Sequence, residues 1–109
     1  MLIGIFGSET TEKVLLYLAN YGEGYAKGIA DNFETHLSAI QKVLIKLELN
    51  GVLVSQYNGK TKMFSWNPRY PFREKLLLLL EQALNSIPKE DTQKYFRQRK
   101  RPRKSGKPL

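Results

Sequence analysis

The sequence changes its apolar periodicity abruptly at Asn50-Gly51, and this change restricts the fold more than any other feature. Before it, apolar residues recur every three or four positions, as on the buried face of a helix: Leu37, Ile40, Leu44 and Leu47. Asn and Gly both tolerate the left-handed backbone conformation that ends helices. We therefore predict a helix from about His36 to Asn50 and a different kind of element directly after it.

That next element is predicted to be a pair of strands. Residues 52–57 and 61–66 are rich in β-branched and aromatic side chains. Asn58-Gly59 between them is the strongest short signal for a β-hairpin that a sequence offers. Asn67-Pro68 ends the second strand, so one helix is followed at once by a two-stranded hairpin.

Two further helices are predicted before this pair. Ser8 is a good N-cap for the first, with Glu9 and Glu12 in its first turn, and residues 22–24 form a turn at its end. The second helix has apolar residues at helical spacing: Ala26, Ile29, Ala30 and Phe33. For residues 2–6 the pattern allows either a short helix or an extended segment.

A last long helix is predicted between Pro71 and Pro88. Its core face carries seven apolar residues: Phe72, Leu76, Leu79, Leu80, Ala83, Leu84 and Ile87. Leu77 and Leu78 lie outside that face, so the helix is apolar over more of its circumference than one small core needs. We expect the excess to form a dimer interface, with contacts at Leu76, Leu77, Leu78, Leu80 and Leu84.

The predicted order is helix, helix, helix, hairpin, helix. It indicates a mainly α fold with a small β-hairpin (α+β), a winged helix-turn-helix with three helices, a two-stranded wing and a C-terminal helix. We expect residues 1–88 to form this domain with its dimerisation helix, and residues 89–109 to be a basic, largely flexible tail. Tyr95 and Phe96 are the large apolar groups of the tail and are expected to dock on the domain.

The positive charge is concentrated in that tail. Of the net charge of +8, residues 1–88 contribute nine Lys/Arg against eight Asp/Glu, a net of +1, and residues 89–109 contribute nine against two, a net of +7. Such a segment favours a polyanionic partner. We predict an arm that neutralises phosphates, with a merely solubilising terminus as the alternative. Its basic residues include Arg97, Arg99, Lys100, Arg101, Arg103 and Lys104.

Three stretches carry a resemblance to a known family. They are Phe33–Leu44 with Lys46-Leu47-Glu48, Asn50–Val54, and the hairpin Ser55–Pro68, and Phe6-Gly7-Ser8 fits as well. Over about residues 5–87 the chain resembles ArsR-type winged helix-turn-helix transcriptional regulators. The resemblance implies a homodimer on double-stranded DNA, with one recognition helix from each subunit in the major groove. It implies groove-facing positions at His36, Ser38, Ala39, Gln41 and Lys42, and wing contacts at Lys60 and Lys62.

The chemistry of these side chains supports such a reading independently. Gln bridges the N6 and N7 atoms of adenine, and Lys donates to guanine O6 and N7. Ser38 is short enough for close approach and bonds a phosphate or a base edge. Lys46 projects from the same side of the helix. The plainer interpretation is that Gln41, Lys42 and Lys46 form an ordinary solvated helix face.

Two other functions stay open on the sequence alone. The near-neutral folded part, with excess apolar surface at Ile45, Leu49, Leu77 and Leu78, also suits a protein-interaction or adaptor module. RNA binding through the tail is a third possibility.

Several classes of function are disfavoured. The chain has no Cys and one His, so neither thiolate chemistry nor a metal site is expected, and no cofactor is predicted. The carboxylates are scattered and His36 has no evident nucleophile partner, so we do not expect an enzyme. The apolar run Leu76–Leu80 is too short to span a bilayer, and residues 1–6 make a poor signal peptide. A cytoplasmic protein without membrane contact is the expectation.

Overall fold

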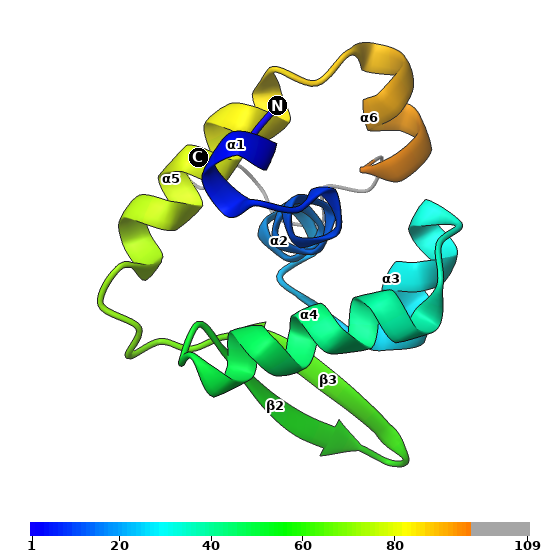
Figure 1. Cartoon of the computed structure of the whole chain (residues 1–109), viewed down its shortest axis with the longest axis vertical. Helices are drawn as coiled ribbons and strands as arrows, with labels where there is room; N and C mark the ends of the chain where they lie inside the picture. Colours follow the sequence, from blue (N-terminus) through cyan, green and yellow to red (C-terminus); the bar gives the residue numbers. More distant parts are fainter. Residues whose placement is uncertain (97–109) are drawn as a thin grey trace, which may run out of the picture.

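The computed structural model describes residues 1–96, so the predicted arm contacts from Arg97 onward lie outside the described residues (Figure 1). The elements in chain order are α1 (Ile3–Phe6), α2 (Glu9–Tyr21), β1 (Glu23–Gly24), α3 (Ala26–Phe33), α4 (Leu37–Leu49), β2 (Leu53–Asn58), β3 (Thr61–Trp66), α5 (Arg73–Asn85) and α6 (Lys89–Tyr95). The predicted winged helix-turn-helix is confirmed, and the segment before α2 is a short helix.

Helix α2 is the centre of the domain. Figure 1 looks along its axis, with α5 and α6 on one side and α3 and α4 on the other. Ser8 caps it as predicted, because its side chain accepts a hydrogen bond of 3.0 Å from the Thr11 N–H. The residues with the least exposed side chains come from every layer around α2: Val14, Leu18, Ile29, Ile40, Leu44, Leu53 and Leu80.

We expect Leu18→Ala to lower the free energy of unfolding by about 2–5 kcal/mol, because it leaves a cavity in the middle of this core. Leu18 is fully buried, and its carbonyl accepts a hydrogen bond of 3.1 Å from the Trp66 indole N–H. Leu49→Ala is the matched control, since Leu49 is 81% exposed and its loss should change stability by less than about 0.5 kcal/mol. Denaturant unfolding measures both, and equal effects would contradict this packing.

The sheet has three strands in the order β1-β3-β2, one more than predicted. The strand β1 is only two residues long, and it pairs through Glu23 with Ser65 and through Gly24 with Phe64. Gly22 and Gly24 led to the prediction of a turn at these residues. The pairing of β1 with β3 is a tertiary contact, which no local sequence pattern reveals. Gly24 is required by packing, because a Cβ there would lie 2.7 Å from Cε1 of Tyr17.

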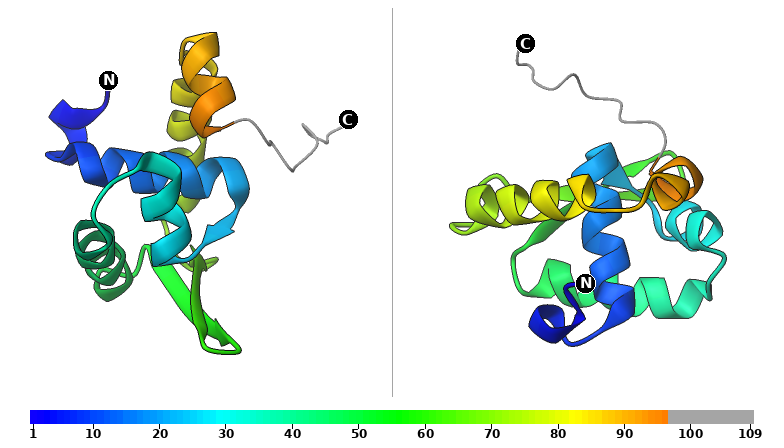
Figure 2. Two further views of the ribbon diagram at one scale, coloured as in Figure 1. Left: turned by 90° about the vertical axis from the view of Figure 1, so that its right-hand side faces the viewer. Right: turned by 90° about the horizontal axis from the view of Figure 1, so that it is seen from above.

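The hairpin forms where predicted, with its loop shifted by one residue. Asn58 pairs with Thr61, so the two-residue loop is Gly59-Lys60 and not Asn58-Gly59. Gly59 has a φ of 68° at the first loop position, the conformation that a type II′ turn requires and that glycine adopts without strain. The hairpin projects from the body of the domain as a wing (Figure 2).

The docking of Tyr95 and Phe96 is confirmed, and the packed part of the chain reaches to Phe96. Phe96 is buried, and the ring of Tyr95 stacks on that of Phe33 with centroids 5.4 Å apart. The Tyr95 carbonyl accepts two hydrogen bonds, one of 3.0 Å from the Tyr21 hydroxyl and one of 3.2 Å from the Asn32 side chain. The short helix α6 therefore holds Phe96, the last described residue, beside α3.

Two of the apolar faces differ from prediction. Leu37 and Phe72, expected in the core, are 39% and 64% exposed, because each lies at a helix start that the neighbouring element does not cover. Leu80 and Leu84, expected at a dimer interface, are buried against α2 in their own chain and have no surface to offer a second copy. Leu78 is 60% exposed, and Leu76 and Leu77 are half-buried.

Candidate nucleic-acid interface

Helices α3 and α4 form the helix-turn-helix. The connection is closed by backbone hydrogen bonds, 3.0 Å from the Thr35 N–H to the Ala30 carbonyl and 3.2 Å from the Glu34 N–H to the Asp31 carbonyl. Glu34 adopts the left-handed conformation, with a φ of 54°, which turns the chain sharply into α4. Ile40 and Leu44 anchor α4 in the core, so its opposite face lies on the surface.

The exposed face of α4 carries most of the predicted polar contacts. Ser38, Gln41, Lys42 and Lys46 are exposed there, and His36 is exposed at the N-cap position. Ala39 departs from the prediction, since it is half-buried and lies on the core side of the helix. The helix thus presents a continuous surface with an amide, a hydroxyl and two ammonium groups.

The same face also carries apolar side chains. Leu37 was predicted to lie in the core, whereas Ile45 and Leu49 were predicted to lie off the core face. Leu37 is 39% exposed, Ile45 is 51% exposed and Leu49 is 81% exposed. Residues 37, 41, 45 and 49 follow one another at intervals of four, so their side chains form one line along α4. That spacing was visible in the sequence, but Leu37 fitted the core pattern equally well.

The wing is tied to α4 through a carboxylate. The Oε1 atom of Glu48 lies 3.6 Å from the Lys62 ammonium, and its Oε2 accepts a hydrogen bond of 2.5 Å from the Ser55 hydroxyl. Lys62 also lies over the ring of Phe64, 5.4 Å from its centroid. Much of the Lys62 charge is therefore balanced by Glu48, and the predicted wing contact at Lys62 is also a brace between wing and helix.

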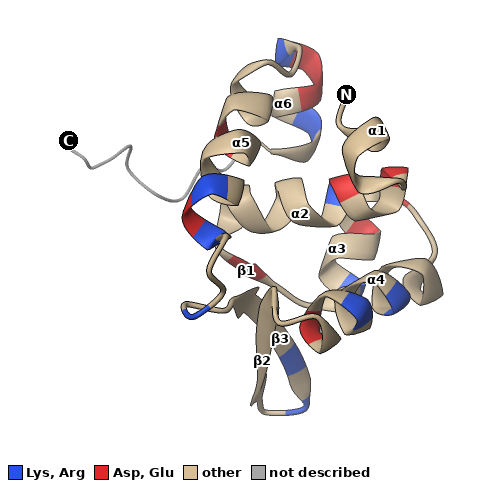
Figure 3. Ribbon diagram, turned by 60° about the vertical axis from the view of Figure 1, so that its left-hand side comes forward, with Lys and Arg blue, Asp and Glu red and all other residues tan. Residues whose placement is uncertain are grey.

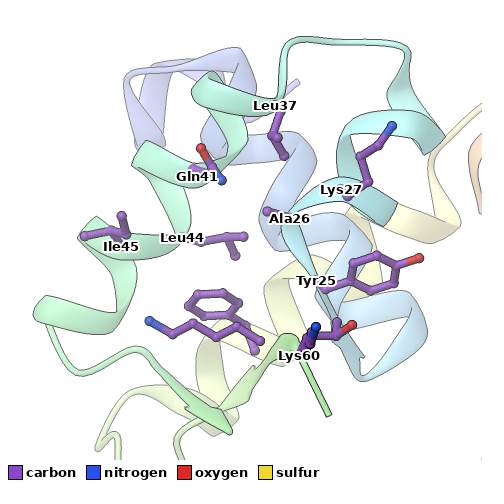
Figure 4. A pocket seen from close by; sticks show the side chains of 11 residues that line it. Tyr25, Ala26, Lys27, Leu37, Gln41, Leu44, Ile45 and Lys60 are labelled. Carbon is purple, nitrogen blue, oxygen red and sulfur yellow. The ribbon is translucent and has the colours of Figure 1, made fainter. Parts of the chain in front are cut away.

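A cavity of about 550 Å³ separates α4 from the wing and the start of α3 (Figure 4). Leu37, Gln41 and Leu44 enter it from α4, and Tyr25 and Lys60 face them across the gap. Both wing lysines line this cavity, as does Lys27, whose pKa is raised by a hydrogen bond to Asp31 and by the charge of that carboxylate. The groove therefore has an apolar floor and cationic edges.

Basic side chains lie on both sides of that groove. Figure 3 marks Lys and Arg positions on α4 and along β3 and the hairpin turn. Near the groove, two acidic groups are held beside cations: Glu48 lies beside Lys62, and Asp31 lies 2.9 Å from Lys27. The face formed by α4 and the wing is consequently suited to an anionic partner although the folded part as a whole is almost neutral.

The fold has known structural counterparts. The chain superposes on the YusO protein from Bacillus subtilis (18% identity, 79% of this chain and 67% of that chain, TM-score 0.56). It superposes on the transcriptional regulator BldR from Sulfolobus solfataricus (17% identity, 84% of this chain and 66% of that chain, TM-score 0.57). It also superposes on the adhesin competence repressor AdcR from Streptococcus pyogenes (16% identity, 84% of this chain and 70% of that chain, TM-score 0.56). The chain thus spans about two thirds of these proteins.

At these identities the likeness establishes the winged-helix fold. No model of a known protein family and no curated protein matches the sequence. The resemblance stated from the sequence is thus confirmed for the winged-helix fold. That the chain is of the ArsR type stays a prediction.

Two further properties of residues 1–96 bear on the site. Within that range no three His, Asp or Glu side chains are grouped closely enough to hold a metal ion. The helices of the same range are all too short or too polar to cross a bilayer.

Proposed function

We propose that this protein is a sequence-specific, DNA-binding transcriptional regulator. The observation that carries the proposal is the pairing of a surface helix, α4, with a wing braced beside it by Glu48 and Lys62. In winged helix-turn-helix proteins the second helix of the motif enters the major groove, and its side chains contact base edges. Structural similarity to proteins described as a transcriptional regulator and a repressor supports the same function.

Each predicted contact except Ala39 has a role in this proposal. His36, Ser38, Gln41 and Lys42 occupy the first half of α4 and read bases or hold the nearest phosphates. Lys46, Lys60 and Lys62 contact the backbone on either side. The basic residues from Arg97 to Lys104 add affinity that does not depend on sequence.

The proposal includes a homodimer of the ArsR type. Leu78 is 60% exposed on α5, with Leu76 and Leu77 beside it. Two-fold symmetry in the protein predicts a two-fold-related binding site.

Selection of binding sites from random duplex DNA tests this function. We expect the full chain to enrich one sequence, arranged as two inverted half-sites whose centres lie about one helical turn apart. Enrichment of a single half-site would retain the DNA-binding function and contradict the dimer. Failure to enrich any duplex at low salt would contradict the function itself.

A protein-interaction module is the second candidate, favoured by the exposed Leu37, Ile45 and Leu49 on the same helix. If residues 1–96 bind no duplex DNA at low salt but form a stable complex with another protein, this alternative replaces the first.

A further inference from the structure

The exposed face of α4 has an unusual composition for a surface helix. A stripe of four residues, Leu37, Gln41, Ile45 and Leu49, runs along it, and three of the four are aliphatic. Ile45 is half exposed and Leu49 almost fully so. Contiguous exposed apolar surface of this kind marks a binding site more often than chance exposure.

The charges around the stripe point to the kind of partner that covers it. By the helical period, Lys42 and Lys46 lie along one edge of the stripe, and the wing with Lys60 and Lys62 lies along the other. The floor between these edges is apolar, since Leu44 (Figure 4) and Phe64 both line the groove. The complementary partner is anionic along two lines and apolar between them.

The major groove of A·T-rich DNA has this character. Its two edges are rows of phosphates, and the C5-methyl of thymine is an apolar group that projects into the groove between them. Adenine, the partner of thymine, presents N7 and N6, which one Gln side chain bridges. The stripe, with one Gln among three aliphatic residues, therefore matches a groove in which thymine methyls lie beside adenine edges.

We infer that α4 recognises A·T-rich sites by contact between thymine methyl groups and the aliphatic residues of this stripe, with Ile45 at its centre. The inference rests on the proposed DNA-binding function and names the class of sequence that the site takes. Gln41 supplies the hydrogen bonds to adenine, and Lys46 and the wing lysines hold the phosphates. Ile45 and Leu49 are thus specificity-determining residues, and Leu37 completes the stripe at the N-terminal end of α4.

The size of the effect follows from the area that a methyl group buries. Burial of one methyl or methylene is worth about 0.8 kcal/mol, which corresponds to about a fourfold change in affinity. One thymine under Ile45 in each half-site of a dimer would therefore change the affinity by about sixteenfold.

Replacing thymine by uracil tests this directly, because uracil retains the pairing and lacks only the C5-methyl. The full chain is titrated against a duplex of alternating A·T of about two helical turns, and against the same duplex with uracil in place of every thymine. We expect at least about fourfold weaker binding to the uracil duplex. The Ile45→Ala variant should bind the thymine duplex more weakly and discriminate less between the two.

Ile5→Ala is the matched control, since Ile5 is 67% exposed on α1, outside the helix-turn-helix, and its replacement should leave the discrimination intact. Equal binding of wild type to the two duplexes, or equal discrimination by wild type and Ile45→Ala, overturns the inference and leaves the DNA-binding function standing. Selection of G·C pairs throughout the half-sites overturns it as well. Absence of binding to either duplex at low salt, and to every random duplex, overturns both.

Discussion

Removal of residues 97–109 is expected to weaken binding to every duplex sequence and to flatten its salt dependence. Seven of these residues are Lys or Arg, whereas the domain that precedes the tail is close to neutral. Each phosphate neutralised adds about 0.9 to the slope of log affinity against log salt, and six or more such contacts are worth about a thousandfold or more between 50 and 200 mM salt. Titration of full-length and truncated protein across that range measures the change.

The structure explains why the loss should leave the fold intact. Phe96 is buried and Tyr95 is held by Tyr21 and Asn32, so truncation after Phe96 removes none of these contacts. A chain with Arg97, Arg99, Arg101 and Arg103 replaced by Lys is the matched control, because it keeps the charge and should keep the salt slope. An unchanged slope after truncation would show that the arm does not contact DNA.

Replacement of both Gln41 and Lys42 by Ala is expected to remove most of the sequence preference while the domain remains folded. A good bidentate contact to a base contributes about 1–3 kcal/mol of discrimination, so loss of two such contacts lowers specific affinity by thirtyfold or more. Both side chains are exposed on α4, and such surface changes alter stability by less than about 0.5 kcal/mol. Affinities for the selected site and for a scrambled duplex provide the comparison.

The control for this variant lies on α5. Lys75→Ala with Gln82→Ala removes the same two residue types from exposed positions of another helix, and should leave specificity unchanged. If the α4 double variant retains full preference for the selected site, these two residues do not determine sequence specificity. Specificity would then have to come from the apolar stripe or from the wing.

The truncation and the double substitution test different parts of the proposal. The tail acts through net charge and should affect all sequences alike, whereas Gln41 and Lys42 act through base edges and should affect only the preferred one. This division of roles between tail and helix follows from the uneven charge, which is a net of +1 over residues 1–88 and +7 over residues 89–109.

The sequence by itself determined the elements whose signals are local. The periodicity of Leu44 and its neighbours, the cap at Ser8 and the Asn50-Gly51 stop fixed the helices, and the β-rich runs around Gly59 fixed the hairpin. These features depend on backbone conformation and on residues within one turn of each other, so they can be recognised without the tertiary structure.

Only the tertiary structure decided which apolar side chains are covered. Leu37 and Leu44 share a helical pattern, but Leu37 is 39% exposed and Leu44 is buried, because the rest of the domain packs against one and not the other. The two-residue strand β1 and the burial of Leu80 and Leu84 have the same origin in contacts with distant segments. Burial is a property of neighbours, and the neighbours of a residue are set by the fold of the whole chain.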